Sequence, residues 1–192
     1  MKNDTIQPYR LAVELSQLFD LESDIDTALS VSMKTLNQFM DSERSSVFIF
    51  QQLKDQLTIF SSIDLEKNEI RIPKSLGVAG WVFEHREPAI VHNAYEDSRF
   101  CKEIDMMTGF CTRNLVCTPL IDSKEQCLGT LQSLNKKSGD FTAEDLDILN
   151  LIARMVAVAI NNSKRYSEIL ITNEARKKLI QQIIGDIGKA FG

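Results

Sequence analysis

The C-terminal quarter of the chain constrains the fold most, because no proline interrupts the sequence after Thr142. Thr142 and Asp145 have the spacing of a capping box, in which two side chains satisfy the first free amides of a helix. A helix of about 40 residues would extend roughly 60 Å, which is longer than a small domain is wide. As one straight helix, its second half would extend past its own domain and need another surface to pack on.

Apolar residues along this predicted helix recur at helical spacing, which places them on one face. Two interpretations remain open, an amphipathic helix that folds back on its own domain and a parallel dimeric coiled coil. We favour the coiled coil, because Asn162 and Asn173 lie on the seam, where polar residues fix the register. The first turns carry a core-facing stripe of Ile148, Leu151, Ile152, Met155, Val158 and Ala159, and the later seam consists of Tyr166, Ile169, Asn173, Ile180, Ile183 and Ile187.

The preceding sequence alternates short apolar runs with polar turns and two helical patterns, which predicts an α+β domain. Two helices come first, and the N-terminal one carries an apolar stripe of Leu11, Leu15 and Leu18. A three-stranded meander, a short glycine-flanked helix, a strand, a second short helix and a β-hairpin follow. The expected helices cover residues 5–19, 25–40, 74–88 and the segment around 105–112, and the expected strands cover 45–50, 56–60, 69–73, 89–92, 114–122 and 126–135.

Composition excludes several classes of protein. A net charge of −5 and a pI near 5.1 give no basic field for nucleic acid. No apolar run approaches the length of a membrane span, and the N-terminus lacks a signal peptide, so we expect a cytoplasmic protein. Four cysteines without a CxxC pair predict reduced thiols, and the two histidines give little support for a metal site.

The segment DMMTGFCTRN is hard to explain as ordinary structure. Asp105, Thr108 and Thr112 recur at spacings of three and four, which predicts one face of a short helix beside a buried strand. These polar groups fit either a helix cap and surface polarity or the lining of a binding pocket. The residue types alone favour the first interpretation.

The stretch LNKKSGDFTAED resembles the Asn-Lys, Phe, Asp-Glu signature of GAF domains, in the variety found in cyclic-nucleotide phosphodiesterases and bacterial adenylyl cyclases. Asn135, Lys136, Phe141 and Asp145 match this signature in kind and spacing, whereas Leu146 replaces the final glutamate. Three segments that precede the signature, EIRIPKSLGVAGWV, YEDSRF and DMMTGFCTRNLVCTPL, occur in the same order as in the family. The resemblance implies a GAF-like six-stranded antiparallel sheet with helices on its faces and a long C-terminal helix.

The resemblance also implies a ligand site. In the family, the lysine and the aspartate of the signature bind each other beneath the pocket and support its lid without contacting the ligand. The resemblance therefore assigns these roles to Lys136 and Asp145. The resemblance places Asp105, Thr108 and Thr112 among the polar side chains around the nucleotide, and Val78 and Ala79 where backbone amides of a helix N-terminus approach the cyclic phosphate. Ser46 corresponds to a serine near the base, and Gln132 to a Glu or Gln that reaches the sugar-phosphate. Cys101 stands where some relatives place an aromatic residue.

These observations predict a non-enzymatic regulatory sensor that binds cAMP or cGMP without another cofactor or a metal. We expect a homodimer formed through the N- and C-terminal helices, with an effector domain outside this chain. The alternatives are a ligand-free dimerisation domain and a sensor for another small molecule. A redox enzyme using Cys101, Cys111 or Cys117 is disfavoured, because no base is evident beside any of these thiols. The expected parts are an N-terminal signalling helix at 1–22, a GAF domain at 23–163 and a connector helix at 164–192.

Overall fold

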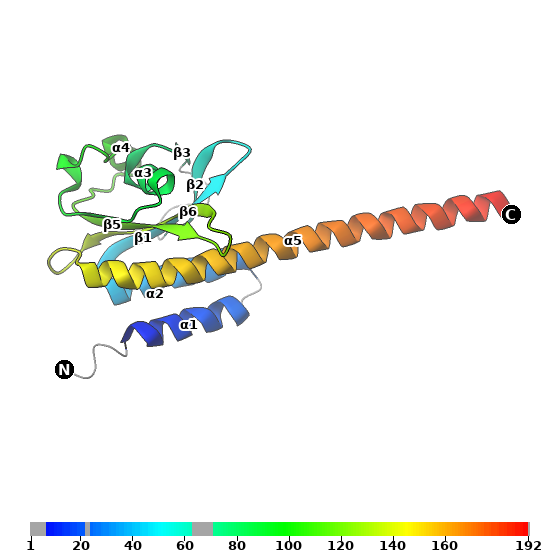
Figure 1. Cartoon of the computed structure of the whole chain (residues 1–192), viewed down its shortest axis with the longest axis horizontal. Coiled ribbons are helices and arrows are strands. Elements are labelled where there is room, and N and C mark those ends of the chain that lie inside the picture. The colour runs from blue at the N-terminus through cyan, green and yellow to red at the C-terminus, as the bar shows by residue number, and fades with distance from the viewer. Residues whose placement is uncertain (1–6, 22–23, 63–70, 192) are drawn as a thin grey trace. The chain divides into compact units, whose positions relative to one another are not determined.

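The computed structural model describes residues 7–21, 24–62 and 71–191, with side chains described from residue 9 to 19, 24 to 59 and 71 to 184. A six-stranded sheet has the strand order β3-β2-β1-β6-β5-β4, and all its neighbouring strands are antiparallel (Figure 1). This sheet confirms the predicted α+β class. Its strands are β1 (Ser42–Gln51), β2 (Gln56–Ser62), β3 (Arg71–Pro73), β4 (Ala89–Val91), β5 (Leu115–Ile121) and β6 (Cys127–Lys136).

The helices cover both faces of the sheet. α1, α2 and the first turns of α5 lie on one face, and the short helices α3 and α4 lie on the other (Figure 1). The chain therefore forms a helix layer, a sheet and an irregular layer that holds the short helices. The elements are α1 (Gln7–Leu21), α2 (Ile25–Met40), α3 (Gly77–His85), a single 3-10 turn η1 (Ala94–Glu96), α4 (Lys102–Thr108) and α5 (Ala143–Phe191).

The two N-terminal helices pack on each other, and α2 packs on the sheet. The Asp24 carboxylate caps α2 by accepting hydrogen bonds from the amides of Asp26 and Thr27, which confirms the predicted helix start. Leu11 and Leu15 of α1 are 3% and 1% exposed, so these two residues of the apolar stripe are already buried within the chain instead of being left free for a dimer contact. Their burial follows from the contact with α2, which the sequence pattern of α1 alone does not indicate.

α5 begins with the predicted capping box. The Thr142 amide donates to Asp145 Oδ2 at 2.9 Å, and the Asp145 amide donates to Thr142 Oγ1 at 3.3 Å. The predicted core-facing stripe is shifted, because Val158 is 56% exposed. The buried hydrophobic residues of α5 keep the helical period, but most of them lie one position away from the predicted ones. They are Leu149, Ile152, Ala153, Val156, Ala157 and Ile160.

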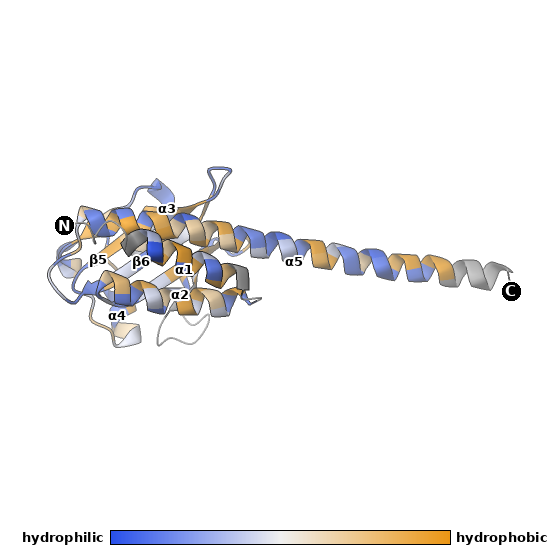
Figure 2. Ribbon diagram, turned by 90° about the horizontal axis from the view of Figure 1, so that it is seen from below, coloured by the Kyte–Doolittle hydropathy of each residue, from blue (hydrophilic) through white to orange (hydrophobic). Residues whose placement is uncertain are grey.

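The chain divides into two compact units, residues 1–158 and residues 159–192. In the second unit, all side chains from 164 to 184 are exposed, and Figure 2 shows orange and blue residues alternating along this part of α5. No helix within the described ranges combines the length and the apolar character that a bilayer span requires. The three predicted parts at 1–22, 23–163 and 164–192 stay a prediction.

Alternation along β1 decides which side chains reach the irregular layer. Arg44, Ser46 and Phe48 share one face of the strand, because successive side chains point to opposite faces. Ser46 pairs across the sheet with Gln132, and Arg44 pairs with Leu134. The centre of the sheet thus presents both polar and apolar side chains beneath α3 and α4.

Candidate functional site

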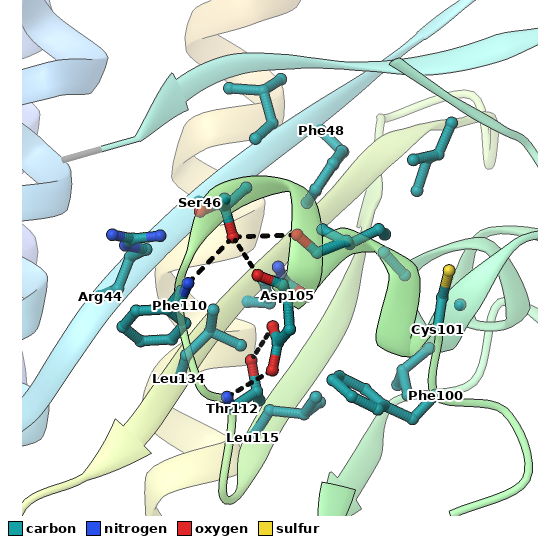
Figure 3. Close-up of a pocket in the computed structure, with 18 of the residues that line it drawn as sticks. Arg44, Ser46, Phe48, Phe100, Cys101, Asp105, Phe110, Thr112, Leu115 and Leu134 are labelled. Atoms are coloured by element: carbon teal, nitrogen blue, oxygen red, sulfur yellow. Dashed lines mark hydrogen bonds between the residues drawn. The ribbon is translucent and has the colours of Figure 1, made fainter. Parts of the chain in front are cut away.

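A pocket lies between the central strands and the layer formed by α3, α4 and the segment after α4 (Figure 3). It contains about 610 Å³ of space free of protein atoms, open solvent at its mouth included. The structure brings all eight predicted ligand-binding residues into its lining: Ser46, Val78, Ala79, Cys101, Asp105, Thr108, Thr112 and Gln132.

The first turn of α3 forms one end of the pocket. Leu76 precedes the helix and supplies no side-chain acceptor, so the amides of Gly77, Val78 and Ala79 lack a side-chain cap from that residue. Gly80 is required here, because a Cβ atom would lie 2.5 Å from the Ser75 carbonyl carbon. The sequence places small residues where the backbone itself lines the cavity, and such a helix start favours an anion.

α4 ends earlier than predicted, so Asp105, Thr108 and Thr112 do not share one helix face. The helix stops at Thr108 because Gly109 adopts a left-handed conformation with φ of 67°. Thr112 lies beyond this turn, and the chain folds back toward Asp105. The Asp105 carboxylate accepts the Thr112 amide at 2.6 Å and the Thr112 hydroxyl at 2.8 Å.

Asp105 therefore holds the segment 109–113, which we call the lid, against the pocket. Its carboxylate also accepts a hydrogen bond from the Tyr95 hydroxyl at 3.3 Å, and Asp105 itself is 6% exposed. Burial, followed by the charge of Asp105, raises the pKa of Tyr95. Figure 3 shows the two Asp105–Thr112 hydrogen bonds beside the cavity. Both residues line the pocket, and their polar groups already bind each other.

The Thr108 hydroxyl is also engaged within the protein. It donates to the Ile104 carbonyl at 2.9 Å and accepts the Phe110 amide at 3.4 Å, so it ties α4 to the start of the lid. Ser46 and Gln132 rise from the sheet at the floor of the pocket. The ligand-binding role of all eight residues stays a prediction.

The signature residues Asn135, Lys136, Phe141 and Asp145 lie outside the lining of the pocket, at the end of β6 and the start of α5. Lys136 Nζ lies 2.6 Å from Asp145 Oδ1, and the two side chains are only 16% and 11% exposed. Lys136 also lies 5.7 Å from the centre of the Phe141 ring, which is fully buried. Asp145 uses its second oxygen for Thr142, so this ion pair joins β6 to the start of α5.

Asn135 connects the lid to the sheet. Its side-chain carbonyl accepts the Arg113 amide at 2.7 Å, and its amide group donates to the Cys111 carbonyl at 2.8 Å. The same amide group donates to Glu43 Oε2 at 2.8 Å, and Arg113 donates to the other oxygen of Glu43. These hydrogen bonds, that from Asn135 most, lower the pKa of Glu43. Glu43 was not predicted, because its charge on an exposed strand end suggests only solvation.

Sequence reasoning also missed the aromatic and cationic wall of the pocket. Phe48, Phe100 and Phe110 line it, and the Arg44 guanidinium lies 4.1 Å from the centre of the Phe110 ring. Alternation along β1 gave a signal for Arg44 and Phe48, since both share a face with Ser46. No comparable signal existed for Phe100 and Phe110, which lie in irregular segments.

Two of the thiols, Cys101 and Cys117, are buried and have raised pKa values. Burial, and next the hydrogen bond to Glu103, raises the pKa of Cys101, and burial raises the pKa of Cys117 to about 12. A thiol with a raised pKa carries less of the thiolate that acts as a nucleophile. Among the described side chains, no three His, Cys, Asp or Glu residues gather in a way that would hold a metal ion.

Known proteins share this sequence pattern and fold. The family model described as GAF domain matches residues 24–160. The chain is 27% identical over 183 residues to a dual 3',5'-cyclic-AMP and -GMP phosphodiesterase 11A from Takifugu rubripes, a match that covers 88% of this chain and 20% of the relative. It is 29% identical over 180 residues to a probable 3',5'-cyclic phosphodiesterase from Caenorhabditis elegans, covering 88% of this chain and 24% of that one. The chain thus spans about a quarter or less of these relatives.

Solved structures agree with the fold. The GAF domain of a phosphoenolpyruvate-protein phosphotransferase from Coxiella burnetii superposes with a TM-score of 0.77 at 17% identity, covering 86% of this chain and 99% of that one. A free methionine-R-sulfoxide reductase from Neisseria meningitidis superposes with a TM-score of 0.71 at 16% identity, covering 86% and 95%. At such identities the likeness shows the fold alone. The family match over most of the chain, together with the sheet order and the Lys136–Asp145 pair, shows that this chain belongs to the GAF domain family.

Proposed function

We propose that this GAF domain is a sensor for a cyclic nucleotide, cAMP or cGMP, in a cytoplasmic signalling protein whose effector lies outside this chain. The observation that carries the proposal is the pocket, which gathers all eight residues that the family resemblance assigned to nucleotide binding. The relatives are named as cyclic-nucleotide phosphodiesterases, which is consistent with such a ligand.

The two ends of the pocket differ in chemistry in a way that suits a nucleotide. The uncapped amides at the start of α3 favour a negatively charged phosphate. At the opposite end, Arg44, Ser46 and Phe110 offer a cation, a hydroxyl and an aromatic ring (Figure 3). A phosphate at α3 and a planar base at this second end would use both chemistries.

Ligand binding would be sensed through the lid. Its two ties, Asp105–Thr112 from α4 and Asn135 with Glu43 from the sheet, position it over the cavity. Asn135 precedes Lys136, whose ion pair reaches Asp145 at the start of α5. A shift of the lid thus has a short route to α5. A ligand biases this arrangement only by binding its two states with different affinity.

We propose that α5 pairs with the α5 of a second copy in a parallel homodimer and so transmits the signal. Tyr166, Ile169, Ile180 and Ile183 are 64%, 57%, 49% and 49% exposed, and with Asn173 included their successive spacings of three, four, seven and three residues follow a heptad. Such a repeat matches the seam of a coiled coil, with Asn173 as its register-fixing polar residue. The side chain of Ile187, also assigned to this seam, lies outside the described residues.

Isothermal titration with cAMP and cGMP tests the sensor function directly. We expect one nucleotide per chain, and thermal melts at 100 times the dissociation constant should show stabilisation of about 2.7 kcal/mol. Ala79→Leu, which fills the phosphate end, should abolish binding, whereas Met106→Leu on the exposed side of α4 should not. A protein that binds neither nucleotide would instead support a ligand-free domain or a different ligand.

Light scattering tests the dimer. Ile180→Lys with Ile183→Lys places charges on the seam, and the variant should be a monomer that still binds nucleotide. A matched control, Gln181→Lys with Gln182→Lys, adds the same charges beside the seam and should remain dimeric. If the seam variant stays a dimer, the subunits pair elsewhere and this route of transmission is wrong.

A further inference from the structure

Arg44 is a cation in the wall of the pocket that the sequence pattern did not assign to any role. It lies near the start of β1 on the same face as Ser46 and Phe48, and its guanidinium stacks 4.1 Å from the centre of the Phe110 ring. Figure 3 shows Arg44 and Phe110 at one end of the pocket and Cys101 at the other. Arg44 therefore lies away from the α3 amides.

Within the described part of the chain, Arg44 has neither a carboxylate at ion-pair distance nor a hydrogen-bond acceptor. Two other arginines near the pocket are paired, Arg99 with both oxygens of Asp97 and Arg113 with Glu43. A guanidinium presents five N–H donors in one plane and no acceptor. The donors of Arg44 thus remain available to a ligand.

The nearby carboxylates are already committed. Glu43, the chain neighbour of Arg44, accepts from Arg113 and Asn135. Asp105 accepts from Thr112 with both of its oxygens. This end of the pocket therefore offers strong donors from Arg44 without a free carboxylate acceptor to balance them.

We infer that Arg44 selects the base of the nucleotide and favours guanine over adenine, an inference that rests on the proposed cyclic-nucleotide function. Guanine presents two adjacent acceptors, O6 and N7, which match the paired donors of an arginine. Adenine presents N7 beside an amino donor, so one arginine N–H would face another donor. Phe110 holds the guanidinium plane in place and supplies a ring surface beside the base.

The competing assignment places the phosphate at Arg44 and the base at α3. An arginine that binds phosphate would strengthen cAMP and cGMP equally, because the two share the same cyclic phosphate. An arginine that reads the base edge would strengthen cGMP alone. The two assignments therefore differ in a ratio of affinities, which is insensitive to small losses of folded protein.

The test is titration of cGMP and cAMP into the full chain and its Arg44→Lys and Arg44→Gln variants, with Arg71→Lys on the edge strand β3 as control. The parent should prefer cGMP by about 5- to 150-fold, the range expected for one bidentate arginine–guanine contact. Arg44→Lys keeps the charge over Phe110 but loses the planar donor pair, so it should lose most of the preference while cAMP affinity stays nearly unchanged. Arg71→Lys should behave as the parent.

Four results would overturn the inference. A parent that binds cAMP as tightly as cGMP, or an Arg44→Lys variant that keeps the cGMP preference, would refute base selection while leaving the sensor function intact. An equal loss of both affinities in Arg44→Gln would assign Arg44 to the phosphate instead. A parent that binds neither nucleotide would refute the proposed function itself, and this inference with it.

Discussion

Replacing Lys136 with methionine should destabilise the domain, because it removes the ion pair that joins β6 to the start of α5. Methionine keeps most of the aliphatic stem and removes the ammonium group that lies 2.6 Å from Asp145 Oδ1. Breaking a fully buried pair costs about 3–5 kcal/mol, whereas exposed pairs contribute about 0–1 kcal/mol. The two side chains are 16% and 11% exposed, and Asp145 keeps its bond to the Thr142 amide, so we expect a loss of about 2–3 kcal/mol.

Urea denaturation followed by circular dichroism measures this loss, and thermal melts should show a drop in Tm of about 4–12 °C. Lys74→Met is the matched control, because Lys74 lies 2.8 Å from Asp55 but the two side chains are 39% and 63% exposed. It should leave the urea midpoint unchanged within error. If Lys136→Met is as stable as this control, the pair does not hold β6 to α5 and the signature has lost its structural role here.

Three further predictions concern the lid and the start of α3. Thr112→Val removes the hydroxyl that donates to Asp105 at 2.8 Å and should cost about 1–2 kcal/mol with faster hydrogen exchange in the lid; unchanged exchange would contradict this tie. The pKa of Glu43 is below its ordinary 4.5, so its stabilisation is present above pH 4.5 and lost as the pH falls through the folded-state value. Glu43→Gln should flatten that part of the pH–stability curve, and an identical curve would refute the assignment. Gly80→Ala should lower the free energy of unfolding by about 1–3 kcal/mol in urea melts, because the alanine Cβ would lie 2.5 Å from the Ser75 backbone. An unchanged stability would show that the backbone at Ser75 shifts to accommodate the methyl group.

The regular elements of the first unit were predictable because each carries its own local signal. Asp24 marks the start of α2, Thr142 with Asp145 marks the start of α5, and alternating apolar runs mark the central strands. The buried stripe of α5 was less predictable. Its early turns are apolar on more than one side, so periodicity did not show that Val158 points to solvent.

The sequence predicted which residues line the pocket but not the hydrogen bonds that these residues make with one another. The family resemblance assigned Asp105 and Thr112 to the pocket, and both line it, but their spacing implied a shared helix face. The left-handed Gly109 ends α4 and turns Thr112 back onto the Asp105 carboxylate, a long-range consequence of one backbone angle. Arg44 escaped assignment because a charged residue near a strand end usually indicates solvent exposure.

The central claim is that the pocket between the sheet and α3 binds a cyclic nucleotide, and an ¹⁵N–¹H NMR titration tests it most directly. Addition of cGMP should shift the amide signals of Val78 and Ala79, which line the phosphate end, and that of Thr112, which holds the lid. The shifts should saturate together at one nucleotide per chain. Saturating nucleotide that leaves these three amides unmoved, or moves only signals outside the pocket, would contradict the account.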